Sequence, residues 1–133
     1  MLWAGRDAAL SGPAAAWWHG LLPAPPMEME VTVPHGRAPS SRGDVRVRRR
    51  DLPLADLVEI GSLTTTALPL TVSETAPVLG ERGPEFLDRA LRRVVSYPAL
   101  CRAHCRNLGR RGSAAAGQML AVAVAVAVAV AVA

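Results

Sequence analysis

The chain has 133 residues, which suits one ordinary domain, and a formal net charge of +4. Two cysteines exclude a disulfide-stapled scaffold, and three tryptophans, one tyrosine and one phenylalanine offer few large core side chains. We therefore expect a mostly α-helical protein with extensive disorder. All cations are arginines, and alanine, glycine and proline are also abundant, so a translated GC-rich open reading frame with no evolved function is one interpretation.

Residues 1–50 are rich in proline, glycine, alanine and arginine, which predicts a disordered region. Prolines interrupt every candidate helix or strand, at positions 13, 23, 25, 26, 34 and 39. Apolar and polar residues alternate at 31–33 and 45–47, but three positions are too few to indicate a strand. Asp7 and Pro13 interrupt the early apolar residues, so no convincing signal peptide is present and cytosolic synthesis is expected.

A short basic cluster lies at the end of this region and consists of Arg46, Arg48, Arg49 and Arg50. Arginine suits phosphate because its planar guanidinium donates two hydrogen bonds at once, so the cluster is a candidate contact for nucleic acid. However, Asp44 and Asp51 flank the cluster, and no aromatic residue is interleaved to stack on bases. A solvated loop is therefore the favoured interpretation, and nucleic acid the less favoured partner.

Residues 51–79 are expected to form one short helix followed by extended chain. An aspartate that suits the N-cap and a proline in the first turn place the helix near 52–60. Beyond the helix, Pro69 and Pro77 interrupt a stretch that is rich in threonine and leucine. Only a short strand, an edge strand or irregular chain fits this pattern.

The clearest predicted element lies in the basic helical segment 80–112. Apolar residues recur there at helical spacing, with acidic residues early and arginines late on the opposite side. A proline then suits the first turn of a second helix, so we expect an amphipathic helical pair near 84–108. Residues 82–112 carry eight arginines against two acids, which makes this segment a second candidate surface for nucleic acid or an acidic partner.

Residues 113–133 form an uncharged apolar tail that ends in alternating alanine and valine, and Arg110 and Arg111 stand immediately before it. As a helix the tail would be about 31 Å long, close to the thickness of a bilayer's hydrocarbon core. It is therefore a candidate membrane anchor, with the two arginines flanking the lipid bilayer on the cytosolic side. The same alternation also suits an aggregation-prone β-strand.

The sequence predicts no enzyme, cofactor or metal site. Cys101, His104 and Cys105 offer three ligands, but a closed zinc site needs four, and the other histidines are distant in sequence. The chain also lacks a nucleophile with a partnered base and a phosphate-binding glycine loop. The leading hypothesis is a small non-enzymatic, tail-anchored membrane protein. The alternative is a soluble arginine-rich binding module for nucleic acid or an acidic partner.

Overall fold

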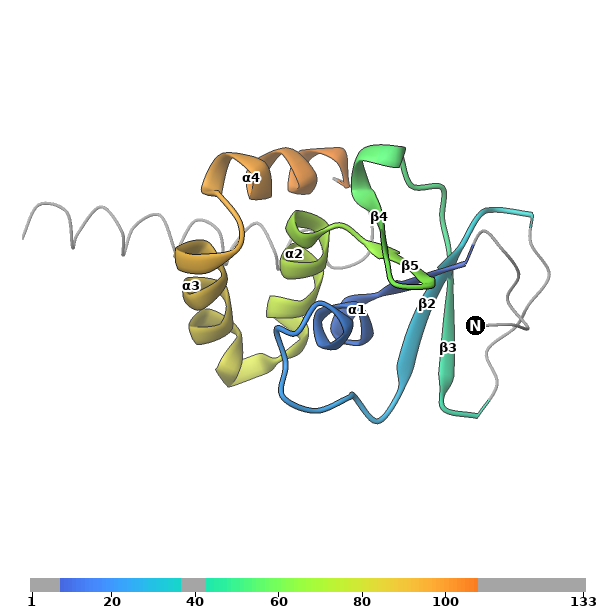
Figure 1. The fold of residues 1–133 in the computed structure, drawn as a ribbon, viewed down its shortest axis with the longest axis horizontal. Helices are drawn as coiled ribbons and strands as arrows, with labels where there is room; N and C mark the ends of the chain where they lie inside the picture. Colours follow the sequence, from blue (N-terminus) through green and yellow to red (C-terminus); the bar gives the residue numbers. More distant parts are fainter. Residues whose placement is uncertain (1–7, 37–42, 108–133) are drawn as a thin grey trace, which may run out of the picture. The chain divides into compact units, whose positions relative to one another are not determined.

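The computed structural model describes residues 8–36 and 43–107, whose contacts separate into two compact units, Met1–Thr71 and Val72–Ala133 (Figure 1). The strands in the described residues are β1 (Ala9–Ser11), β2 (Met29–Val33), β3 (Val45–Arg49), β4 (Leu57–Ile60) and β5 (Leu63–Thr66). The α-helices are α1 (Gly12–Trp18), α2 (Leu68–Val78), α3 (Gly83–Arg93) and α4 (Tyr97–Arg106). Two short 3-10 helices accompany them, η2 (Leu54–Asp56) and η3 (Gly80–Arg82).

The five strands form one sheet in the first unit, in the order β3-β2-β1-β5-β4 (Figure 1). β1 pairs antiparallel with β2 and parallel with β5, so the first strand of the chain lies at the centre. β3 runs parallel to β2, and β4 runs antiparallel to β5. The sheet is therefore mixed, and it joins segments that are far apart in sequence, because Leu10 pairs with Thr65.

α1 covers the apolar face of this sheet and contacts β1, β2 and β5. The helix forms because Pro13 lies in its first turn, where the missing N–H costs no hydrogen bond, and alanines follow. Trp18 Nε1 donates to the Ile60 carbonyl at 3.1 Å, and His19 Nε2 donates to the Thr66 carbonyl at 2.8 Å. The core beneath α1 consists of buried Leu10, Ala14, Ala15 and Val31, with Trp18, Met29, Val45, Val47 and Leu63 packed against them.

The prediction of disorder across residues 1–50 is wrong for the part that the structure describes, since β1, α1, β2 and β3 lie there. The prolines do not break these elements, because they lie at their ends or between them. Pro13 is in the first turn of α1, and Pro34 directly follows β2. The two short alternations at 31–33 and 45–47 are parts of β2 and β3, and pairing between the strands lengthens each to five residues.

The helix expected near 52–60 is also wrong. Only η2 is helical there, and β4 occupies the rest. Gly61, which suits the end of a helix, instead lies in the tight turn between β4 and β5, where Ile60 pairs with Leu63. Its φ of +65° is the left-handed conformation that such turns require.

The extended chain expected at 62–78 is a strand, β5, followed by a helix, α2. Pro69 is the second residue of α2, where no backbone donor is needed, and Pro77 is one residue from its end. Thr71 Oγ1 donates to the Thr66 carbonyl at 2.9 Å and lies 2.7 Å from the Thr66 hydroxyl. These side-chain bonds connect the end of β5 to the first turn of α2.

The helical pair expected near 84–108 is present in the second unit as α3 and α4. α3 carries Glu85 in its first turn and arginines in its last turn, as the helix dipole favours. Ser96 is the N-cap of α4, and its hydroxyl accepts a hydrogen bond from the backbone N–H of Ala99 at 3.2 Å. The two helices bury one face each, through Phe86, Leu87, Ala90, Leu100 and Ala103.

The expectation of a mostly α-helical, extensively disordered protein is therefore corrected to a fold that combines a mixed five-stranded sheet with helices. The strands escape a search for periodicity because each is only three to five residues long. Their stability comes from pairing between distant segments, which no local pattern records.

The membrane interpretation is corrected as well. Within residues 8–36 and 43–107, no helix is long and apolar enough to cross a bilayer. α2 and α3 have 11 residues each, whereas a spanning helix needs about 20. The tail 113–133, expected to be a helix and an anchor, and its flanking Arg110 and Arg111 lie outside the described residues. The membrane hypothesis is not carried further.

Candidate functional site

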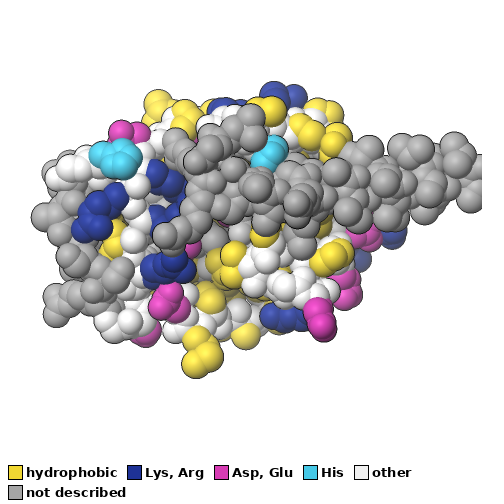
Figure 2. Space-filling model, turned by 180° about the vertical axis from the view of Figure 1, so that it is seen from behind, with side chains coloured by type: hydrophobic (Ala, Val, Ile, Leu, Met, Phe, Trp, Pro, Cys, Tyr) yellow, Lys and Arg dark blue, Asp and Glu magenta, His cyan; other side chains and the backbone are white. Residues whose placement is uncertain are grey.

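The structure divides the predicted basic cluster between the two faces of the sheet. Side chains alternate along β3, so Arg46, Arg48 and Arg50 point to the face opposite α1, and Arg49 points to the other face. Arg46 and Arg49 are exposed, whereas Arg50 is buried. Figure 2 shows one face of the molecule, on which dark blue arginine side chains lie among side chains of other types. The four arginines therefore do not form a single surface for a nucleic acid.

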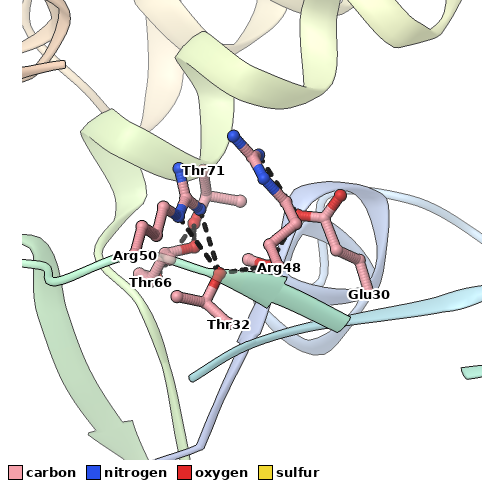
Figure 3. Close-up of polar contacts among 7 residues, drawn as sticks. Glu30, Thr32, Arg48, Arg50, Thr66 and Thr71 are labelled. Atoms are coloured by element: carbon pink, nitrogen blue, oxygen red, sulfur yellow. Dashed lines mark hydrogen bonds and ion pairs between the residues drawn. The ribbon is translucent and has the colours of Figure 1, made fainter. Parts of the chain in front are cut away.

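Two arginines of the cluster instead belong to a network of polar side chains on the sheet (Figure 3). Arg50 donates from Nε and Nη2 to the Thr32 hydroxyl, at 3.2 and 3.1 Å. Thr32 donates to Ser11 Oγ at 2.9 Å, and Ser11 donates to Glu30 Oε2 at 2.6 Å. Arg48 Nη1 reaches the same carboxylate oxygen at 3.5 Å. The chain of donors that starts at Arg50 ends at Glu30, which Arg48 also contacts, so the network places one half-buried carboxylate between two cations.

The chain passes close to this carboxylate at Gly12. The residue has a φ of +59°, and a Cβ placed there would lie 3.1 Å from Glu30 Oε2. Glycine is thus required both by the backbone conformation and by the space. Ser11 precedes the helix as its N-cap, but its hydroxyl makes no capping bond, because it is committed to Glu30.

A pocket of about 430 Å³ opens on the same face of the sheet, entirely within the first unit. Thr32 and Arg50 of the polar network form part of its wall, next to Asp51. Its remaining lining comes from three strands, the residue after β2 and the segment around η2, namely Ala9, Pro34, Leu52, Leu54, Leu57, Val58, Glu59 and Thr64. The pocket combines aliphatic walls with a few charged groups, which is the usual make-up of a small-molecule site.

The second unit presents the other basic surface predicted from the sequence. Residues 89–106 contain five arginines and no acidic residue, and all five arginines are exposed. Arg92 pairs with Asp88 one turn earlier on α3, at 3.1 Å, and this ion pair is open to solvent. No side-chain hydrogen bond or ion pair joins Arg89, Arg93 or Arg102 to any described residue. Their guanidinium groups are therefore available to an anionic partner.

The candidate metal ligands on α4 do not assemble into a metal site. Within the described residues, no group of three or more histidine, cysteine or acidic side chains lies close enough together to hold an ion. Cys101 and Cys105 are free thiols, one half-buried and one exposed. A hydrogen bond with the Cys101 side chain, together with partial burial and the charge of the thiolate, raises the pKa of Tyr97 above its ordinary value of 10.0.

Sequence reasoning missed both the polar network and the pocket. The sequence predicts Arg48 and Arg50 in a solvated loop or, less favoured, in contact with nucleic acid, whereas in the structure they contact Glu30 and Thr32. The alternation of arginine with valine in 45–50 was a signal for a strand with one basic face. Nothing in the sequence indicated that the partner strand would supply Glu30.

Comparisons with known proteins identify no family for this chain. No protein-family model matches the chain, and no curated protein resembles it closely enough in sequence to count as a relative.

Proposed function

We propose that this protein is a non-enzymatic binding module that contacts nucleic-acid phosphates through the outer surfaces of α3 and α4. The observation that carries the proposal is the stretch 89–106, in which five exposed arginines occur without one acidic residue. A guanidinium matches a phosphate better than an ammonium does, because it donates two parallel hydrogen bonds. The absence of lysine throughout the chain fits this use.

The helical surface is favoured over the arginines of β3 because the side chains of three of its five arginines, Arg89, Arg93 and Arg102, have no ionic partner among the described residues. Arg48 and Arg50 already neutralise and stabilise groups of the sheet. In contrast, Arg89 and Arg93 lie one turn apart on the exposed side of α3 and have no ionic partner among the described residues. Removing them therefore changes the surface charge and leaves the fold intact.

An exposed aromatic ring lies within the same stretch. Tyr97, the first residue of α4, is 40% exposed, and it lies four residues after Arg93, the last residue of α3. Aromatic rings close to cations favour single-stranded nucleic acids, because unpaired bases stack on the ring while the cations neutralise phosphates. We therefore expect single strands to bind more tightly than duplexes.

The test is fluorescence anisotropy with a labelled single-stranded oligonucleotide, at several salt concentrations. Binding should weaken as salt rises, and the double variant R89Q/R93Q should lower the log–log salt slope by about 1.4, or about 0.7 for each lost phosphate contact. The matched control R46Q/R49Q removes the same charge from β3 and should bind almost as the native protein does.

Three results would overturn the proposal: no binding at low salt, equal weakening by the control variant, or equal competition by polyglutamate. The last result would favour an acidic protein as the partner, since polyglutamate carries charge but no phosphate or base. Far-UV circular dichroism of both variants checks that their helices are intact.

A further inference from the structure

The pocket on the face of the sheet opposite α1 is not part of the proposed nucleic-acid surface on α3 and α4. It lies in the first unit, beside η2 and the edge strand β4. Its volume of about 430 Å³ falls within the range of small-molecule sites, which is about 300 to 1,000 Å³. A ligand of a few heavy atoms fits such a space.

The charged side chains that line the pocket differ in the hydrogen bonds and ion pairs that they already make. Arg50 is 6% exposed and donates two hydrogen bonds to Thr32. Asp51 accepts a hydrogen bond from the backbone N–H of His35 at 3.1 Å. The Glu59 side chain, in contrast, is exposed, and its carboxylate makes no hydrogen bond or ion pair with any described residue. It is therefore the carboxylate that a ligand meets without displacing a contact described above.

The same wall exposes aliphatic side chains to an unusual degree. Leu54 is 87% exposed and Val58 is 39% exposed, and both line the pocket together with Leu57. Glu59 lies two residues after Leu57 on the same side of β4, so the carboxylate and this aliphatic side chain are neighbours. Covering this apolar area would stabilise a complex through the hydrophobic effect, at about 25 cal/mol for each Å² removed from water.

We propose that this pocket binds a small organic cation that carries an aliphatic chain. The cationic nitrogen pairs with Glu59, and the chain packs against Leu54 and Leu57. The sign of the charge follows from the lining, which holds one cationic side chain against two carboxylates, with the cationic one already bonded to Thr32. An anionic ligand would meet Glu59 unfavourably and would gain no available cation in return.

The cation has two chemical sources, a free alkylamine or the side chain of a lysine on another protein. The experiment therefore uses hexylamine as the probe, with hexanol and hexanoate as matched neutral and anionic probes, and a blocked lysine peptide as a separate arm. NMR of isotope-labelled full-length protein reports binding through the methyl signals of Leu54 and Leu57.

The expected result is saturable movement of these methyl signals with hexylamine, weaker movement with hexanol and none with hexanoate. E59Q should weaken hexylamine binding by about five-fold, the size of one solvent-exposed ion pair. The matched control E28Q removes an exposed carboxylate outside the pocket and should leave the affinity unchanged.

Equal binding of hexanoate, an unchanged affinity in E59Q, or signal changes confined to other residues would each overturn the proposal. E59D keeps the charge and should retain most of the affinity, which separates loss of charge from local unfolding. Tighter binding of the lysine peptide than of hexylamine would assign the site to a protein side chain. The reverse order would assign it to a free amine.

Discussion

The Ser11 hydroxyl lies 2.6 Å from Glu30 Oε2, and it makes this bond in place of the cap that a serine at this position usually gives to its helix. Ser11 is fully buried and also accepts a hydrogen bond from Thr32. One hydroxyl therefore connects the end of β1 to two positions of β2. The connection allows charged and polar side chains to occupy one face of the sheet.

Replacing Ser11 with alanine should destabilise the protein by about 1 to 3 kcal/mol, because Glu30 loses a donor and the buried Thr32 hydroxyl loses its acceptor. Urea denaturation followed by tryptophan fluorescence measures the change. The matched control is S62A, at an exposed serine in the turn between β4 and β5, where a change within about 0.5 kcal/mol is expected. Equal effects of the two substitutions would show that the network contributes nothing.

Two glycines with positive φ allow the space beside Glu30 to be tested separately from backbone strain. Gly12 and Gly20 have φ values of +59° and +83°, so alanine should cost about 1 to 2 kcal/mol at either position. At Gly12 the new Cβ would also press on the Glu30 carboxylate, whereas at Gly20 nothing lies within 4 Å. G12A should therefore be less stable than G20A by about 1 kcal/mol or more in thermal or urea unfolding. Equal stability of the two variants would contradict the close approach.

The single tyrosine provides a spectroscopic test of the start of α4. Hydrogen bonding with the Cys101 side chain is the largest cause that raises the pKa of Tyr97. C101A should therefore shift the absorbance titration at alkaline pH toward the ordinary value of 10.0, and the control C105A should leave it unchanged. Since the chain has one tyrosine, the signal belongs to Tyr97 alone.

The sign of the linked stability follows from the direction of this shift. The folded protein favours the neutral phenol, so the contribution is complete below the unfolded pKa of 10.0 and is lost as pH rises through the folded value. Stability should fall at alkaline pH, and it should fall less steeply in C101A. An identical pH profile in both proteins would refute the link between the two side chains.

The core of the second unit should respond to the loss of one leucine. Leu100 is fully buried in α4, so L100A should cost about 2 to 5 kcal/mol through lost burial and the cavity left behind. L54A removes the same atoms from a side chain that is 87% exposed, and it should cost less than about 0.5 kcal/mol. Calorimetry of both variants measures the contrast. A small effect of L100A would mean that α4 is not packed as described.

The helices of the second unit were predictable because their information is local. In α3 the burial of Phe86, Leu87 and Ala90 follows the period of the helix itself. β1 offers no such signal, since its three residues become a strand only by pairing with β2 and β5. α2 escapes prediction for another reason: proline breaks helices in their interior, but Pro69 lies in the first turn, where proline is tolerated, and Pro77 lies inside the helix only one residue before its end.

The candidate sites were predictable only as far as residue type. The sequence identified arginine-rich stretches, and the exposure of Arg89 and Arg93 agrees with the helical pattern. It did not separate Arg46 from Arg50, because strand alternation places both on one face, and only the structure shows that Arg50 contacts Thr32. The pocket beside Glu59 depends on segments from across the first unit, so no single stretch of sequence indicates it.

The central place of β1 has a consequence for how the chain is synthesised. Ala9–Ser11 leaves the ribosome well before one of its two neighbours, β5, which ends at Thr66. Until then β1 has an open edge, and an open edge readily pairs with strands of other chains. Folding of the sheet during translation therefore waits until the chain has been made as far as Thr66. A nascent chain that stalls before β5 emerges would be a substrate for chaperones and not a smaller version of the fold.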